Sequence, residues 1–312
     1  MVKNTALHLP AKLFCYFTSM NHFYIKSRYS SKIVQLFQYA FFAFGLCLAG
    51  FSLKAQYFYK DIVSNRQLSQ QFNILKKEHL TTIKLKSFEG DGEPSDGFFC
   101  EKKIKKDFTQ SQMISKSNVT GQSLITVDYN GNGQPIKSID ETPASSNTTE
   151  YEYDSSGRLK IMRTITKADD DSAAITETHE YFYSDAGVLL KMLRKKNGVL
   201  LATITFVTDS SGNVIEEDPS GSSLENKFYY YYDDENRLTD VVHYNERAQR
   251  LLPEYMYQYN AQNLPEQMIS TEEGSSNYFI WQYTYNNMNL VATEQCFSKQ
   301  KELLGKIEYE YE

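Results

Sequence analysis

The sequence predicts an all-β protein, an antiparallel meander of hairpin repeats that forms one continuous twisted sheet, with one helix near the N-terminus. An aromatic-x-Tyr pair recurs along the chain, a Gly or Asn follows it at a constant distance, and an alternating apolar segment comes next. The 24 Tyr and 19 Phe also favour strands over helices. A sustained period of this length indicates an array of supersecondary units.

Residues 1–55 are predicted to be a secretory signal peptide. Basic residues at 26, 28 and 32 precede a mainly apolar run over 33–53, and Ala55 supplies the small residue before the cut. Met20 is an alternative start, which would make residues 1–19 an over-called extension. A membrane anchor is the competing interpretation, but Gln35 and Gln38 shorten the apolar run, so cleavage is favoured. No stable membrane span is then expected in the mature chain.

Residues 56–118 are predicted to form a cap region for the sheet. Ser64 and Gln67 have the spacing of a capping box, and apolar residues follow at helical spacing, which predicts a helix near 65–78. Strands are expected over 81–88 and 98–108. We expect the helix to cover an end of the sheet, because repeat arrays need caps.

Residues 119–312 are predicted to be the repeat array. The second residue of each pair stands at 129, 153, 183, 208, 232, 259, 285 and 311. Residues i and i+2 of a strand share a face, so each pair places two side chains side by side. A lone hairpin is marginal in water, so successive hairpins must share one sheet.

A turn residue closes each hairpin four positions after the pair. These residues are Gly133, Gly157, Gly187, Gly212, Asn236, Asn263 and Asn289. Gly, and Asn to a lesser degree, enters the left-handed backbone region readily, whereas other L-residues lose about 1–2 kcal/mol there. A type I turn closed by such a residue is a common hairpin connection.

Two copies carry a family resemblance. Tyr-Glu-Tyr-Asp-Ser-Ser-Gly-Arg-Leu at 151–159 and Tyr-Asp-Asp-Glu-Asn-Arg-Leu-Thr at 232–239 closely resemble the YD repeat of RHS-type proteins. The resemblance implies long coiled β-sheets, and large members build shells around toxic C-terminal domains. Here the repeats are too few for a shell, and no variable domain is expected after the last one. The family's Asp-Pro-x-Gly motif occurs only mid-chain at 218–221, where a turn is expected. The resemblance therefore implies a short, standalone exported member, and no catalytic residue carries over.

Charge argues against nucleic-acid binding. The first 55 residues hold six of the 33 basic residues and none of the 39 acidic ones, so the rest of the chain has a formal net charge of −12. Such a chain repels phosphate backbones.

The predicted mature chain keeps two cysteines, Cys100 and Cys296. A disulfide between them and two isolated buried thiols are both open interpretations. No metal or cofactor is expected. Residues 128–133 match the opening of a calcium loop, but Ile139 stands where a bidentate Glu is needed, so turn chemistry is the better interpretation.

A catalytic set is not evident. His79, His179 and His243 lie in unrelated contexts and are interpreted as surface or half-buried strand residues. Glu177, Glu180 and Glu294 are candidates for a carboxylate pair in glycoside hydrolysis, although an acidic chain produces such pairs by chance.

Rows of aromatic rings are the best candidate for ligand binding. Phe279, Trp281, Tyr283 and Tyr285 share one face of a predicted strand, which is interpreted mainly as packing surface. Tyr229 and Tyr231 lie on the opposite face from their neighbours and are expected to be exposed. The candidate ligand-binding residues are Tyr229, Tyr231, Trp281 and Tyr283.

The predicted function is that of an exported, non-catalytic repeat protein of the cell envelope. It is expected to bind a glycan or an envelope protein through its sheet surface, in the periplasm or at the outer surface. The alternatives are a carboxylate-dependent envelope hydrolase and a fragment of an RHS-type polymorphic toxin system.

Overall fold

A computed structural model describes residues 58–312, except 119, 169–172, 221–225, 246–247 and 272–275. The predicted signal peptide lies outside the described residues. The described part contains one helix, α2 (Tyr59–Lys77), and 18 strands. The strands are β1 (Thr82–Glu89), β2 (Phe99–Ile104), β3 (Gln110–Ser117), β4 (Gly121–Tyr129), β5 (Pro135–Thr142), β6 (Ser145–Tyr153), β7 (Leu159–Ala168), β8 (Ile175–Tyr183), β9 (Leu189–Lys196), β10 (Val199–Thr208), β11 (Val214–Ser220), β12 (Phe228–Tyr232), β13 (Leu238–Asn245), β14 (Arg250–Tyr259), β15 (Pro265–Thr271), β16 (Tyr278–Tyr285), β17 (Val291–Phe297) and β18 (Leu303–Tyr311).

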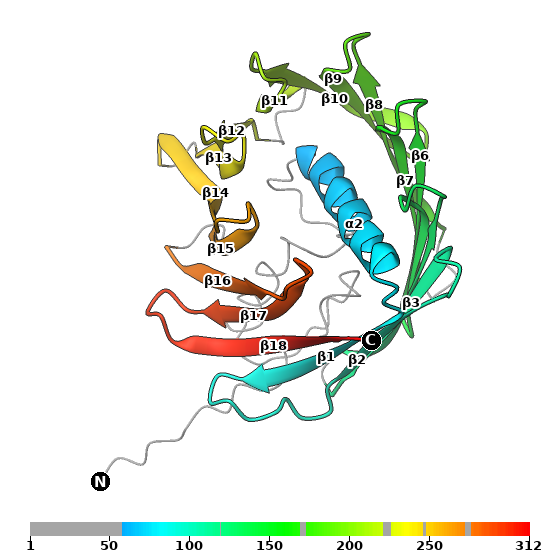
Figure 1. The fold of residues 1–312 in the computed structure, drawn as a ribbon. Coiled ribbons are helices and arrows are strands. Elements are labelled where there is room, and N and C mark those ends of the chain that lie inside the picture. Colours follow the sequence, from blue (N-terminus) through cyan, green and yellow to red (C-terminus); the bar gives the residue numbers. More distant parts are fainter. Residues whose placement is uncertain (1–57, 119, 169–172, 221–225, 246–247, 272–275) are drawn as a thin grey trace.

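The sheet closes on itself. Each strand pairs antiparallel with the next along the chain, and β1 pairs with β2 on one side and with β18 on the other. The register with β18 runs from Ile83↔Tyr311 to Glu89↔Gly305. The strands form a ring around α2 (Figure 1). The all-β class is therefore confirmed, but the expectation of an open twisted sheet is wrong, because the structure is a closed barrel.

Closure has a physical reason. An open array of hairpins would leave two edge strands with unpaired backbone groups, and a closed barrel has none. The strands that complete the ring, β1 to β3, lack the Tyr-x-Tyr motif, so the repeat pattern did not show that they continue the same sheet.

All seven turn residues have a left-handed backbone. Their φ angles lie between 59° for Asn236 and 85° for Gly187 and Gly212. The side chain of the polar residue that follows each pair forms hydrogen bonds with the backbone of the turn. In one copy, the Asp154 carboxylate accepts hydrogen bonds from the backbone N–H groups of Ser156 and Arg158, each at 2.9 Å. The Asp of the motif is thus explained by turn chemistry.

The second tyrosine of each pair joins one hairpin to the preceding one. Tyr259 donates its phenol hydrogen to the carbonyl oxygen of Leu238 at 2.6 Å. Leu238 is the first residue of the strand that follows the previous turn. The same bond recurs from Tyr153 to Pro135, Tyr183 to Leu159, Tyr232 to Val214, Tyr285 to Pro265 and Tyr311 to Val291. The recurring Tyr therefore holds neighbouring repeats in register.

A valine at Gly157 is expected to lower the free energy of unfolding by about 1–2 kcal/mol, since φ is +76° there. Gly157→Asn should cost less, because Asn fills the same position in other copies. Gly131→Val is the matched control, since that glycine has open space and lies outside the left-handed region. Urea unfolding measures the difference. Equal stability of Gly157→Val and the wild type would contradict the strained-turn explanation.

The helix differs from its prediction in both extent and capping. It begins at Tyr59, so Ser64 lies within it and the predicted capping box does not start it. The N-cap residue, Phe58, makes no side-chain capping bond. Lys76 and Lys77 do lie in the last turn, where cations oppose the helix dipole favourably. The start of this helix is stabilised by a residue far away in sequence.

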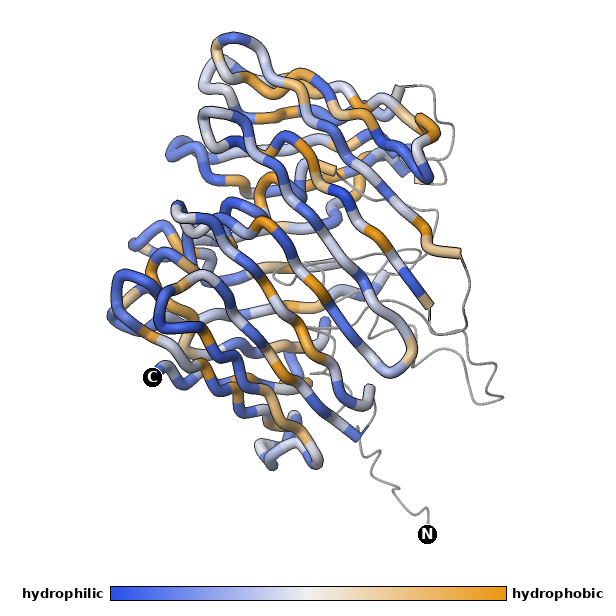
Figure 2. Tube along the Cα trace, turned by 90° about the vertical axis from the view of Figure 1, so that its right-hand side faces the viewer, coloured by the Kyte–Doolittle hydropathy of each residue, from blue (hydrophilic) through white to orange (hydrophobic). Residues whose placement is uncertain are grey.

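The barrel interior is apolar and aromatic around the helix. Phe72 of α2 stacks on Tyr129 of β4 with ring centroids 3.5 Å apart. The first tyrosine of several pairs also points inward, and Tyr151, Tyr181, Tyr230 and Tyr283 are buried. Apolar and polar residues alternate along much of the wall (Figure 2), as expected when one face of each strand meets the core.

Candidate functional site

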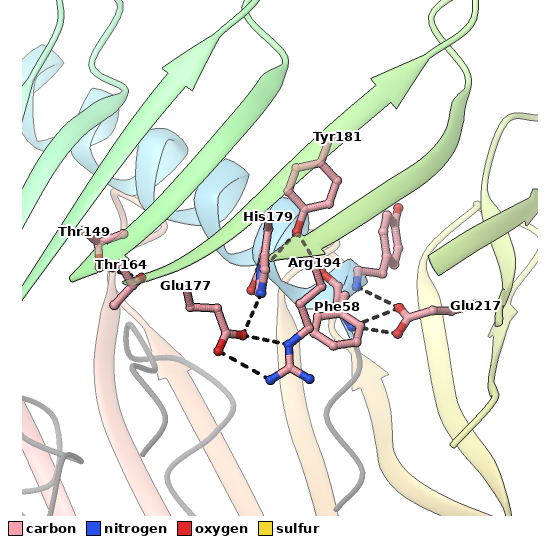
Figure 3. A network of polar contacts seen from close by, with 10 residues as sticks. Phe58, Thr149, Thr164, Glu177, His179, Tyr181, Arg194 and Glu217 are labelled. Atoms are coloured by element: carbon pink, nitrogen blue, oxygen red, sulfur yellow. Dashed lines mark hydrogen bonds and ion pairs between the residues drawn. The ribbon is translucent and has the colours of Figure 1, made fainter. Parts of the chain in front are cut away.

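A buried carboxylate caps the start of the helix. Glu217 of β11 is 1% exposed. It accepts hydrogen bonds from the N–H of Phe58 at 2.8 Å and the N–H of Tyr59 at 2.8 Å. The hydroxyl of Tyr230 donates a third bond at 2.7 Å. Free N–H groups at a helix start favour an anion, so Glu217 holds α2 inside the barrel (Figure 3).

The first turn of the helix makes a second buried contact. The Asp61 carboxylate lies 2.6 Å from Nδ1 of His179 and accepts a 2.7 Å hydrogen bond from the Tyr181 hydroxyl. The side chains of Asp61 and His179 are 8% and 4% exposed. Removing one partner of a buried ion pair destabilises a fold strongly, because the other charge stays buried without a partner. This contact therefore fixes the helix in place.

The contact continues along the wall. Nε2 of His179 lies 3.0 Å from Glu177, and Glu177 accepts a 2.9 Å bond from Nε of Arg194. The Arg194 guanidinium also lies over the ring of Phe58, 5.5 Å from its centroid. We call Asp61, Glu177, His179, Arg194 and Glu217 the helix anchor.

Burial and charge shift the titration of this anchor. Burial lowers the pKa of His179, but Asp61 and then Glu177 raise it more, to about 9. Burial raises the pKa of Glu177, but its bonds with His179 and Arg194 lower it further, to about 2. Burial raises the pKa of Glu217 to about 7 despite its three donors. His179 is therefore charged at neutral pH.

The anchor can hold the helix: four of its members contact one another, and Glu217 bonds to the helix start and to Tyr230. The expectation of a turn at 218–221 is wrong for residues 218–220, which belong to β11 together with Glu217. His179 is fully buried, so its interpretation as a surface or half-buried residue is also wrong. The signal for Glu217 was weak, because a Glu in the polar segment 216–220 resembles a loop residue.

A second buried carboxylate lies elsewhere in the interior. Glu294 of β17 is 6% exposed and accepts a 2.8 Å hydrogen bond from the Tyr309 hydroxyl. Burial raises its pKa to about 7. It lines a cavity of about 180 Å³ between α2 and the wall.

The candidate glycosidase carboxylates do not converge. Glu177 and Glu180 are three residues apart on one strand, which places them on opposite faces. Glu180 pairs with Lys195 on the outer wall at 2.6 Å. Glu294 is on β17, away from β8.

The candidate ligand-binding rings divide between the two sides of the wall. Trp281 and Tyr283 are inside, 4% and 6% exposed, and the Trp281 indole N–H donates to Ser270. Neither ring is available on the outer surface. Tyr231 is 49% exposed, and Tyr229 is half-buried beside Lys227.

Neither cysteine forms a disulfide, and both are buried. Cys100 lies on β2 and Cys296 on β17, with β18 and β1 between their strands. Among the described residues, no cluster of His, Cys, Asp and Glu could hold a metal ion. Asn130 of the calcium-like segment accepts from the backbone N–H groups of its own turn. No helix in the part of the chain described has the length and apolar character needed to cross a bilayer.

The outer wall carries a localised apolar strip. Five consecutive strands, β8 to β12, each point a large apolar side chain outward. In each strand this residue is next to the terminal residue at the end that meets the Gly or Asn turn. These side chains are Phe182, Leu190, Val207, Ile215 and Tyr231, from 37% to 49% exposed. We call this set the outer strip. Several equivalent positions on other strands hold polar residues, namely Asp128, Glu152, Lys160, Gln258 and Glu266, although Ile136 of β5 is apolar and exposed.

Comparison with known proteins gives no family assignment. No family model matches the chain, and no curated protein matches it. Solved structures with some similarity include a porin-like protein from Bacteroides uniformis, with a TM-score of 0.38, 14% identity and coverage of 75% of this chain and 98% of that one. Another is the TcdB2-TccC3-TEV structure, with a TM-score of 0.23, 11% identity and coverage of 69% of this chain and 15% of that one.

A third is the Photorhabdus luminescens Tc holotoxin pore, with a TM-score of 0.24, 10% identity and coverage of 69% of this chain and 16% of that one. The chain thus matches only a small part of either toxin chain. These low similarities carry no argument about activity, and the YD-repeat resemblance stays a prediction.

Proposed function

We propose that this chain is an exported, non-catalytic barrel protein of the cell envelope that binds a partner protein through the outer strip. The observation that supports this proposal is the contiguous row of exposed apolar side chains on β8 to β12. Soluble proteins rarely expose apolar residues in a continuous patch unless the patch binds something. The predicted signal peptide supports export.

The chemistry of the strip favours a protein over a glycan. Three of its five side chains, Leu190, Val207 and Ile215, are aliphatic and offer no flat ring for a sugar face. Aliphatic side chains gain most by burial against other apolar side chains. The partner is therefore a protein with an apolar face.

Ion pairs elsewhere on the outer wall suit an aqueous surrounding. Lys84 pairs with Glu312, Lys86 with Glu310, and Arg163 with Glu150, all on the outside of the barrel. A wall that faces lipid carries an apolar band instead. These ion pairs support the proposal that the barrel lies in an aqueous compartment of the envelope.

The test compares two triple variants. Leu190→Lys/Val207→Lys/Ile215→Lys disrupts the strip, and Phe99→Lys/Ile114→Lys/Ile136→Lys places the same charges on β2, β3 and β5, where exposure is 40% to 49%. Each variant should keep the wild-type thermal midpoint, because exposed substitutions usually change stability by about 0.5 kcal/mol or less.

A partner captured from envelope extract is then purified and titrated against all three proteins. We expect the strip variant to bind at least about a hundredfold more weakly, as for loss of several apolar contacts, and the control variant to bind like the wild type. Equal binding by the strip variant would overturn the proposal. The proposal would also be overturned if the wild type bound a glycan on an array and the strip variant kept that binding.

A further inference from the structure

The cavity beside α2 has the form of a small-molecule site. It lies among β17, β18 and β1 to β4, whereas the helix anchor lies at β8, β9 and β11. Its lining is mainly apolar and includes Phe72 and Leu75 from the helix and Ile125, Val127 and Leu290 from the wall. An engineered apolar cavity of about 150 Å³ is large enough for benzene, so this one admits a ligand of similar size.

Two charged side chains and several hydroxyls face the cavity. Glu294 contributes a carboxylate and Lys102 an ammonium group, with Tyr129, Tyr309 and Tyr311 as the aromatic members. Glu294 is buried, whereas Lys102 is half-buried. A buried carboxylate costs free energy unless it is paired or well hydrogen-bonded. The Tyr309 hydroxyl supplies a neutral donor, and a carboxylate can accept about four hydrogen bonds.

We propose that this cavity binds a small organic amine, whose ammonium group pairs with Glu294 and whose apolar body packs against Phe72, Val127 and Leu290. An ammonium group supplies both the charge and the donors that the buried carboxylate lacks. The rings of Tyr129 and Tyr309 line the same space and add to its apolar surface. The site is independent of the outer strip.

The test uses three probes of one size: benzylamine, toluene and benzoate. Isothermal titration of the purified protein at pH 8 should show benzylamine binding at least about tenfold tighter than toluene, and benzoate binding no tighter than toluene. Benzylamine affinity should fall as the pH drops below 7, because protonation of Glu294 removes its charge while the amine stays charged. The Met113 methyl group, which lines the cavity, should shift in NMR spectra on binding.

Two variants make the test specific. Glu294→Gln should bring benzylamine affinity down to that of toluene, while Glu308→Gln, which removes a carboxylate paired with Lys306 outside the cavity, should leave it unchanged. Met113→Trp fills the space and should abolish binding of every probe, which keeps the test valid if Glu294→Gln folds poorly.

Three results would overturn the proposal. Equal affinity for benzylamine and toluene would mean that the cavity is only apolar. Tighter binding of benzoate than of benzylamine would mean that the cavity binds an anion through Lys102 instead. Failure of all three probes to bind at millimolar concentration would mean that the cavity is not a ligand site.

Discussion

Replacing Asp61 with alanine is expected to lower the free energy of unfolding by about 3–5 kcal/mol, the cost of breaking a buried ion pair from one side. The change removes the acceptor that lies 2.6 Å from His179 and 2.7 Å from the Tyr181 hydroxyl. Both groups stay buried, so water cannot replace the lost partner. Urea unfolding at pH 6 measures the effect, because His179 is charged there.

Two controls separate the ion pair from general damage. Asp61→Asn keeps an acceptor oxygen and should cost less than Asp61→Ala. Asp185→Ala removes an exposed aspartate from a turn and should change stability by about 0.5 kcal/mol or less. A double-mutant cycle of Asp61→Ala with His179→Ala should show strong coupling, since each residue acts through the other. Additive effects of the two changes would contradict the anchor.

The second large effect is a loss of stability as the pH rises from about 5 to 9, through proton linkage. His179 has an ordinary pKa of 6.5 and a folded pKa of about 9. Its contribution is therefore complete below pH 6.5 and is lost as the pH rises through 9. Each pKa unit corresponds to about 1.4 kcal/mol, so this group contributes about 3 kcal/mol.

Glu217 adds to the same trend through burial. Its pKa rises from 4.5 to about 7, so between these values the folded protein keeps a proton that the unfolded chain has released. Stability falls with rising pH across that window. Glu177 gives the opposite limb, because its pKa falls from 4.5 to about 2 and its contribution is lost as the pH drops through that range.

Unfolding by urea at pH 3, 5, 7 and 9 tests this profile, with an expected maximum near pH 5. Glu217→Gln should reduce the fall between pH 4.5 and 7, to which the raised pKa values of Glu294 and Asp140 also contribute, while leaving the fall from 6.5 to 9 in place. A wild-type profile that is level from pH 5 to 9 would contradict the charged state assigned to His179.

The hairpin units could be predicted from local sequence. The reason is that each motif residue acts within a few positions of itself or on the neighbouring hairpin. Gly157 and Asn236 adopt a left-handed backbone, and Asp154 bonds to its own turn. The outer strip was readable as well, because its members are the middle residues of the Tyr-x-Tyr pairs and their turn-side counterparts. Of its members, only Tyr231 was predicted to be exposed.

The anchor could not be predicted, because its members are far apart in the chain. Glu217 and Phe58 are separated by 159 positions, and Asp61 and His179 by 118. Ser64 and Gln67 have the spacing of a cap, yet the helix starts earlier because Glu217 satisfies its first N–H groups. Because a distant carboxylate caps the helix, the local capping-box spacing does not predict where the helix begins.

The amino-acid sequence by itself determined the strand-turn-strand unit, its repetition and the inward direction of the paired tyrosines, since these follow from backbone conformation and a period of two. Tertiary structure decided that the sheet closes, that the helix lies inside it and that two buried carboxylates face the helix start and a cavity. Those features depend on the pairing of β1 with β18. Only that pairing brings the ends of the array together and gives the helix an enclosed space to fill.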